Sequence, residues 1–195
     1  MKKINSTAIV LNIENIDTDQ IIPAKFLKST NRDGFGKHLF SNWRYDDEGN
    51  PKEDFAFNQF ESESEILIAG NNFGCGSSRE HAAWAIADYG IKVIISSQFA
   101  DIFKGNALNN GVLPVEVSQD SLRVMTKYFS KHKSVKIQID LENQVLKAVD
   151  QDIVLHINFD IDPLKKQFLM EGISDIEYLI KQEKEISKFE STHKL

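Results

Sequence analysis

Short apolar runs alternate with segments of helical periodicity along the first two thirds of the chain. Runs with almost no polar residue are typical of strands that are buried on both faces. The runs predicted to form such strands cover residues 7–11, 66–69, 92–96 and 112–117. Apolar residues recur at helical spacing over 79–89 and 99–108, and a glycine follows each of these predicted helices, at Gly90 and Gly111. The alternation of strands and helices predicts an α/β domain.

The last third of the chain has a different pattern, in which polar and apolar residues alternate with the period of two that half-exposed antiparallel strands show. The strands predicted in this way cover residues 135–139, 144–149 and 153–157. Further helices are predicted over residues 23–29, 120–129 and 163–180. Charged residues dominate from 181 to 195, and we expect this tail to fray. The whole pattern predicts a single domain over 1–195 of the α/β or α+β class, with a mixed sheet in its middle and an antiparallel layer toward its end.

The segment from about 31 to 65 has no periodicity, yet it is rich in aromatic residues. These residues are Phe35, Phe40, Trp43, Tyr45, Phe55, Phe57 and Phe60. Loops of this length are uncommon in compact domains and are usually functional or disordered, and so many aromatic residues argue against plain disorder. Two interpretations that do not exclude each other stay open. Either the aromatic side chains fold onto the chain's own core, or they dock a partner, because aromatic residues are enriched at interfaces.

Composition and charge exclude several classes of protein. Apolar residues make up 41% and charged residues 27% of the 195 residues, as in ordinary soluble globular proteins. The net charge of −6 argues against binding to a nucleic-acid backbone. No apolar run approaches the ~20 residues of a membrane span, and the first residues lack the pattern of a secretory leader. We therefore expect a cytoplasmic protein without a nucleic-acid or membrane partner.

The most informative segment is the turn over 71–81, between the strand at 66–69 and the following helix. Ser77 and Glu80 have the spacing of a capping box, which predicts that the helix begins there. The N–H groups at a helix start attract anions, and the Arg79 guanidinium can hold a carboxylate by two parallel hydrogen bonds. The turn lacks the Lys-Ser/Thr pair of a P-loop, and Arg79 stands where the dinucleotide fingerprint needs glycine. The alternative is that Ser77 only caps the helix and Arg79 makes a surface ion pair.

The sequence GSSREHAA over 76–83 resembles the signature of the swivel domain of the aconitase superfamily. In its longer form, 72–82, it is similar to the free-standing small subunits of the 3-isopropylmalate dehydratase family, also called isopropylmalate isomerases. Two further segments resemble that family in the same order, DTDQIIPAKFL at 17–27 and the stretch from SQFADIF to NGVLP over 97–114. The resemblance implies a three-layer β/β/α swivel domain, which the periodicity alone does not distinguish from an open doubly wound sheet.

The resemblance also implies an activity, the isomerisation of 2-isopropylmalate to 3-isopropylmalate by dehydration to 2-isopropylmaleate and rehydration, a step of leucine biosynthesis. It assigns the catalytic base to Ser77 as an alkoxide, which the helix start, Ser78 and the catalytic Arg79 would stabilise as in an oxyanion hole. Arg79 and Ser78 are also predicted to bind a substrate carboxylate. A second substrate carboxylate needs a second cation, for which Lys25, Lys28 and Arg32 are left as alternatives.

Three other functions stay open at this stage. One is that of a related dehydratase acting on homoaconitate, citraconate or dimethylmalate. Another is that of a non-catalytic module with the swivel fold. The third is that of an enzyme working alone, such as a nucleotide-binding transferase.

Cys75 is the single cysteine, so the chain has no thiolate set for an iron–sulfur cluster. If the implied chemistry is correct, a [4Fe–4S] cluster belongs to a large-subunit partner, where its iron acts as the Lewis acid for the departing hydroxide. We predict no metal ligands in this chain. We interpret Asp17 and Asp19 as turn and capping groups. We interpret Cys75 and His81 as residues that pack in the structure and take no part in catalysis.

The predicted substrate loop also contains apolar side chains. Phe26 and Leu27 follow the first family motif and would suit the branched alkyl group of the substrate. Such an apolar contact distinguishes two substrates that differ by one methylene group by only about 1–3 kcal/mol of binding free energy.

Overall fold

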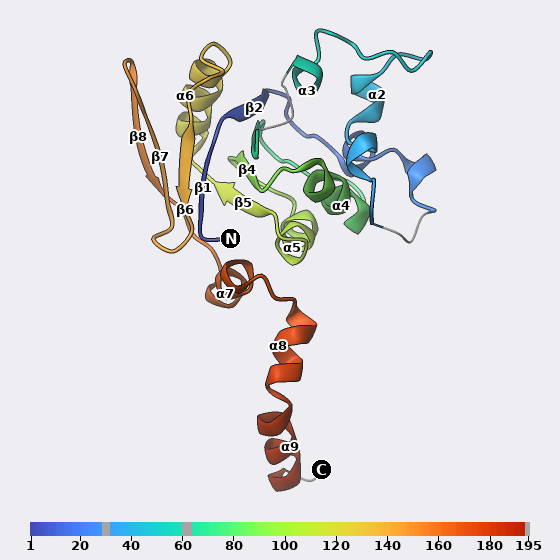
Figure 1. Ribbon diagram of the computed structural model, residues 1–195, viewed down its shortest axis with the longest axis vertical. Coiled ribbons are helices and arrows are strands. Elements are labelled where there is room, and N and C mark those ends of the chain that lie inside the picture. Colours follow the sequence, from blue (N-terminus) through green and yellow to red (C-terminus); the bar gives the residue numbers. More distant parts are fainter. Residues whose placement is uncertain (29–31, 60–63, 194–195) are drawn as a thin grey trace.

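The computed structural model describes residues 1–28, 32–59 and 64–193 and contains two four-stranded sheets (Figure 1). In the first sheet all neighbouring strands are parallel. Its strands in spatial order are β2 (Ala8–Leu11), β3 (Ile66–Ala69), β4 (Val93–Ser96) and β5 (Leu113–Glu116). These are the four apolar runs of the sequence, so the predicted buried strands are confirmed.

The second sheet is antiparallel throughout. Its strands in spatial order are β1 (Lys3–Ser6), β6 (Ile137–Asp140), β7 (Val145–Asp150) and β8 (Ile153–Asn158). The two strand directions thus occupy separate sheets instead of one mixed sheet. The sequence pattern does not predict β1, because only Ile4 and Ser6 of its four residues are buried and its pairing partner β6 lies far away in the sequence.

Strand β3 shows how the two sheets make two cores. Ile66 and Ile68 face the core between the sheets, whereas Leu67 and Ala69 face the core beneath the helices. A strand that is buried on both faces must be apolar at every position, which explains the unbroken run in the sequence. The layers are the antiparallel sheet, the parallel sheet and a helical layer, so the β/β/α fold implied by the family resemblance is confirmed.

The helices complete the two cores. α4 (Glu80–Tyr89) and α5 (Asp101–Asn109) cover the parallel sheet on its outer face, and α4 ends at Gly90 with φ +105°, as its glycine predicted. α6 (Gln119–Phe129) and α7 (Pro163–Glu171) contribute side chains to the core between the sheets. No helix among the described residues combines the length and the apolar content that a bilayer span requires.

The aromatic segment packs onto the core between the parallel sheet and α4 and α5, called the helix-side core below. Its described part contains three short helices: η2 (Gly36–His38), α2 (Ser41–Arg44) and α3 (Ala56–Gln59). Phe35, Phe40 and Phe57 are at most 4% exposed, and Trp43 and Phe55 pack against them. The interpretation that these aromatic residues fold onto the chain's own core is therefore confirmed, while Phe60 lies outside the described residues.

Two predictions, one for residues 23–29 and one for the C-terminal tail, need correction. The helix predicted over 23–29 is a short 3-10 helix, η1 (Ala24–Phe26), in its described part, and the α-helix α1 (Thr18–Ile21) precedes it. The tail expected to fray from residue 181 contains a helix, α9 (Glu183–Thr192), after α8 (Asp175–Lys181). Both C-terminal helices project away from the three layers (Figure 1).

Candidate active site

The three segments that carry the family motifs meet at one edge of the parallel sheet. They follow β2, β3 and β4, which are neighbours, and the carboxyl ends of parallel strands lie at the same edge, where α/β proteins bind ligands. Backbone hydrogen bonds fasten the signature turn to both flanking loops. The Gly74 N–H donates to the Ile16 carbonyl at 2.8 Å, and the Phe73 N–H donates to the Gln98 carbonyl at 3.0 Å.

A cavity of about 240 Å³ opens where these loops converge. It is lined by Thr18, Gly74, Gly76, Ser77, Ser78, Arg79, Ala100, Asp101, Ile102 and Phe103. The structure therefore brings together Ser77, Ser78 and Arg79, the three signature residues for which the sequence predicts chemistry. The sequence analysis did not predict that Asp101, Ile102 and Phe103, in the first turn of α5, also line the cavity. The signal that could have found them is the position of the third motif, which follows β4 in the same way as the signature turn follows β3.

The capping box predicted for Ser77 and Glu80 is wrong. The helix α4 begins at Glu80, with Arg79 as its N-cap in an extended conformation, and no side chain caps it. Gly76, at φ +88°, turns the chain so that Ser77 and Ser78 lie outside the helix. The Ser77 hydroxyl is consequently not used as a cap and belongs to the wall of the cavity.

The electrostatic character of the cavity comes mainly from helix ends. α5 begins at Asp101, beside the cavity, and like α4 it has no side-chain cap. The N–H groups of a first helical turn lack intrahelical partners and carry the positive end of the helix dipole. The exposed carboxylate of Asp101 opposes this field in part. Two uncapped helix starts and one guanidinium nevertheless make the cavity suited to a small anion.

The hydroxyl-bearing part of the turn is accessible and held in place. Ser77 and Ser78 are both exposed. The Thr18 hydroxyl, which is buried, donates to the Ser77 carbonyl at 2.8 Å and so fixes the backbone beneath the Ser77 side chain. A dicarboxylic acid of small size has an open route to this hydroxyl.

Arg79 forms an ion pair with Asp19, in which Nη1 donates to the Asp19 carboxylate. The Arg79 side chain is only 18% exposed, whereas that of Asp19 is 53% exposed. A guanidinium has five N–H donors, so the pair with Asp19 orients the group and leaves further donors for a second carboxylate. Asp19 belongs to α1, so this ion pair joins the first motif to the second, as the Thr18–Ser77 hydrogen bond does.

Gly74 is required by a close approach of two of the loops. Its φ is +77°, and a Cβ atom placed on it would lie 2.2 Å from Cγ of Phe103. Phe103 is buried, and its ring lies 5.1 Å from that of Phe73, measured between centroids. The absence of a side chain at Gly74 thus lets α5 approach the signature turn and bring its first turn to the cavity.

The three candidate cations for a second carboxylate lie outside this cavity lining. Arg32 donates to the Asn110 side chain at 3.2 Å, pairs with Glu80 at 3.5 Å and lies over the Trp84 ring. Lys25 lines a separate hollow of about 600 Å³, and Lys28 is exposed. Of these three cations, Arg32 contacts Glu80, which is the residue next to Arg79.

The apolar side chains predicted to meet a branched substrate have other surroundings. Phe26 stacks on His38 with 3.8 Å between ring centroids, and Leu27 packs against the helix-side core. The apolar lining of the cavity comes instead from Ala100, Ile102 and Phe103.

The remaining candidates have structural roles. Asp17 caps α1, accepting from the Gln20 N–H at 2.7 Å, and the Gln20 side chain accepts from the Asp17 N–H. Burial, followed by the neighbouring Asp17 charge, raises the pKa of the Cys75 thiol, which disfavours a reactive thiolate. His81 packs against the Phe35 and Trp84 rings, which also contact each other. The predictions of capping for Asp17 and of packing for His81 are confirmed, whereas Cys75 is only partly buried and its thiol donates to the Asn15 carbonyl at 3.4 Å.

Comparison with known proteins gives consistent findings. The family model described as the aconitase C-terminal domain matches residues 1–120. A 3-isopropylmalate dehydratase small subunit from Christiangramia forsetii is 52% identical over 96% of this chain and 90% of that protein. One from Cytophaga hutchinsonii is 50% identical over 98% of this chain and 94% of that protein. The crystal structure of the 3-isopropylmalate dehydratase LeuD from Methanocaldococcus jannaschii has a TM-score of 0.70 and 28% identity, covering 95% of this chain and 98% of that chain.

Proposed function

The chain belongs to the aconitase C-terminal domain family, among the small subunits of 3-isopropylmalate dehydratase, and from this premise we propose how it takes part in catalysis. It acts as the small subunit of a two-subunit hydro-lyase that interconverts 2-isopropylmalate and 3-isopropylmalate through 2-isopropylmaleate, in leucine biosynthesis. The cavity around Ser77 and Arg79 is its contribution to the active site. We assign the assembled enzyme to the cytoplasm.

The single observation that carries this proposal is the exposed Ser77 hydroxyl beside an oriented guanidinium and two uncapped helix starts. Dehydration removes a proton from a carbon next to a carboxylate, and rehydration returns it. Ser77 as alkoxide takes this proton at Oγ and gives it back. A serine hydroxyl is a weak base in water, so the positive helix ends and Arg79 must stabilise the alkoxide, on the principle of an oxyanion hole.

Arg79 and Ser78 bind one carboxylate of the substrate. The donors of the guanidinium that Asp19 does not use would form the bidentate pair, and the Ser78 hydroxyl would add a third hydrogen bond. The second carboxylate needs a second cation, for which Lys25, Lys28 and Arg32 remain the alternatives. The contact of Arg32 with Glu80 favours Arg32 among them.

The residues of this chain do not fit an iron–sulfur cluster. The sequence has one cysteine, and no group of three His, Cys, Asp or Glu side chains among the described residues could hold a metal ion. Because a departing hydroxide needs a Lewis acid, that group belongs to the large subunit. The substrate cavity is then completed only when the two subunits meet.

Ser77→Ala tests the proposal in the enzyme reconstituted with its large subunit. Removal of a positioned proton-transfer group typically lowers the rate by ~10²–10⁴, so kcat should fall by at least the lower factor. Ser77 is exposed, and the thermal midpoint and co-purification with the large subunit should stay unchanged. Ser191→Ala, at an exposed serine of α9, is the matched control and should keep full activity. Near-normal turnover of Ser77→Ala would remove this hydroxyl from the mechanism.

The substrate itself is tested by a panel of hydroxy diacids with the reconstituted complex. Isopropylmalate should have the highest kcat/KM, and a higher value for homoaconitate, citraconate or dimethylmalate would reassign the substrate. Turnover of isopropylmalate by this chain alone would contradict the two-subunit assignment.

A further inference from the structure

One wall of the cavity beside Ser77 combines apolar side chains with a carboxylate. This wall, called the α5 wall below, is formed by the first turn of α5 and the residue before it. Its apolar members are Ala100, Ile102 and Phe103, and its charged member is Asp101. Ile102 is 59% exposed, and Asp101 is exposed as well, so both can meet a molecule that enters the cavity.

The Asp101 carboxylate differs from the first-turn acids of several other helices. Acidic residues are favourable in first turns because they face the positive end of the helix dipole, and in these other helices they also have a cation as partner. The pairs are Asp19 with Arg79 in α1, Glu80 with Arg32 in α4, Asp120 with Arg123 in α6 and Asp175 with Lys165 in α8. Within the residues that the structure describes, the Asp101 carboxylate has no ion-pair or hydrogen-bond partner. Its charge is therefore left to act on a molecule in the cavity.

The lysine that is closest to Asp101 along α5 does not neutralise this charge. Lys104 lies three residues later, at a spacing that would allow an ion pair with Asp101. Its Nζ instead pairs with Glu116 at 3.1 Å. The charged residues of the cavity lining are thus Asp101 and Arg79, and the latter already shares its charge with Asp19.

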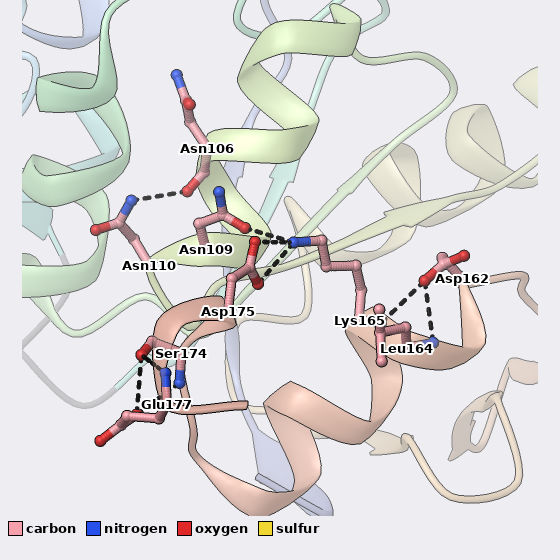
Figure 2. Close-up of polar contacts among 9 residues, drawn as sticks. All are labelled: Asn106, Asn109, Asn110, Asp162, Leu164, Lys165, Ser174, Asp175 and Glu177. Carbon is pink, nitrogen blue, oxygen red and sulfur yellow. Dashed lines mark hydrogen bonds and ion pairs between the residues drawn. The ribbon is translucent and has the colours of Figure 1, made fainter. Parts of the chain in front are cut away.

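The α5 wall is held in place at both ends of the helix. Near the start of α5, Phe103 is buried beside Gly74 of the signature turn. At the other end, the Asn109 side chain accepts a hydrogen bond from Nζ of Lys165 at 2.9 Å (Figure 2). A helix fixed in this way cannot withdraw from the cavity, so the backbone of Asp101 keeps its place when a ligand binds.

We propose that Asp101 determines the substrate class of the cavity by repelling a carboxylate at the place where the substrate has its isopropyl group. The inference rests on the proposed function, from which this substituent is taken. The apolar side chain of Ile102 favours an uncharged alkyl group on the same wall, whereas a carboxymethyl group there would bring a like charge to Asp101. Proteins often achieve specificity through such a repulsive group in addition to the attractive contacts.

The charges of the site suit a substrate with two carboxylates. Under the proposed function, Arg79 binds one of them and a second cation binds the other. A third carboxylate on the α5 wall would find no further cation in the cavity lining and would face Asp101. Two like charges about 6 Å apart at a partly exposed site repel by an energy that corresponds to roughly a tenfold change in a dissociation constant.

The test uses two ligands that differ only in the group expected at the α5 wall. Isopropylsuccinate and carboxymethylsuccinate share a diacid skeleton, and because both lack the hydroxyl group neither can be dehydrated. Calorimetry measures their dissociation constants with the enzyme reconstituted from the full-length chain and the large subunit. Asp101→Asn, which removes the charge at nearly constant size, should shift the ratio of the two constants toward carboxymethylsuccinate by about tenfold. The preference of the wild type for isopropylsuccinate should also weaken as the ionic strength rises.

Asp120→Asn is the matched control. It removes an exposed first-turn acid of α6 that does not line the cavity, so the ratio of the two dissociation constants should stay as in the wild type. Any general effect of losing a carboxylate at a helix start appears in both variants.

Each outcome decides the inference. A tenfold shift of the ratio in Asp101→Asn, with none in Asp120→Asn, supports it. An unchanged ratio in Asp101→Asn, equal shifts in both variants, or a wild type that binds neither ligand overturns it. So does a fall of kcat for 3-isopropylmalate by ~10² or more in Asp101→Asn, which would make Asp101 a proton-transfer group, and so does weakened binding of the large subunit, which would assign Asp101 to the subunit contact. The two ligands are bound without turnover, whereas Ser77→Ala is judged by turnover, so failure of this inference and failure of the proposed function are separable.

Discussion

Replacing Gly74 by alanine should destabilise the protein more than the same change at any other described glycine of positive φ, because two separate effects coincide there. The backbone has φ +77°, and a left-handed conformation costs a residue with a side chain about 1–2 kcal/mol. The new methyl group would also lie 2.2 Å from Cγ and 2.6 Å from Cβ of Phe103. Overpacking of this kind costs about 1–3 kcal/mol. The expected loss in the free energy of unfolding is therefore roughly 2–5 kcal/mol.

Two other glycines separate these effects. Gly90 has φ +105°, and no atom lies within 4 Å of the position that a Cβ would take, so Gly90→Ala should show only the backbone cost of about 1–2 kcal/mol. Gly105 lies within α5 with ordinary helical geometry and open space around it, so Gly105→Ala should stabilise by about 0.5–1 kcal/mol. Urea unfolding of the three variants measures the differences directly. The thermal midpoint should follow by about 2–4 °C per kcal/mol for a chain of this size.

The Gly74→Ala substitution should also impair catalysis, because the methyl group forces the signature turn away from the start of α5. A misplacement of about 1 Å in an active site can lower the rate by ~10². Phe103→Ala in the Gly74→Ala background removes the opposing ring together with its Cγ, and a double-mutant cycle should give a favourable coupling of about 1–3 kcal/mol. Equal destabilisation by Gly74→Ala and Gly90→Ala, or zero coupling to Phe103, would refute the argument from crowding.

Two further predictions follow from the charged groups. Arg79→Lys should raise KM and lower kcat, because an ammonium cannot hold Asp19 and a substrate carboxylate in a bidentate geometry; steady-state kinetics of the reconstituted enzyme measure this, and an unchanged KM would make Arg79 purely structural. Hydrogen bonds from the Asn143 backbone and side chain, and then Lys3, lower the pKa of Asp140 from 3.8 to about 2, so its contribution to stability is present above pH 3.8 and is lost as the pH falls toward 2. Asp140→Asn should therefore flatten the pH dependence of the thermal midpoint between pH 3.8 and 2. If the thermal midpoint of the variant falls with pH in this range as steeply as that of the wild type, Asp140 does not contribute to stability.

Much of the fold and the location of the site could be predicted from local sequence. The runs that form β2 to β5 are apolar at nearly every position because both faces of the parallel sheet are covered, a condition that leaves its mark on each residue. The turn over 71–81 could also be singled out from the sequence as the candidate anion site, because glycines, hydroxyls and an arginine lie there between a predicted strand and a predicted helix.

Tertiary structure alone decided the features that depend on residues far apart in the chain. β1 exists because β6 offers it hydrogen bonds, and its own mostly polar sequence carries no strand signal. The start of α4 lies at Glu80, against the S-x-x-E spacing, because the signature turn is tied to the loops after β2 and β4. The pairing of Arg79 with Asp19 and the approach of α5 to Gly74 arise in the same way. Local propensity is encoded within a few residues, whereas these contacts exist only once the parallel strands have brought three distant loops to one edge of the sheet.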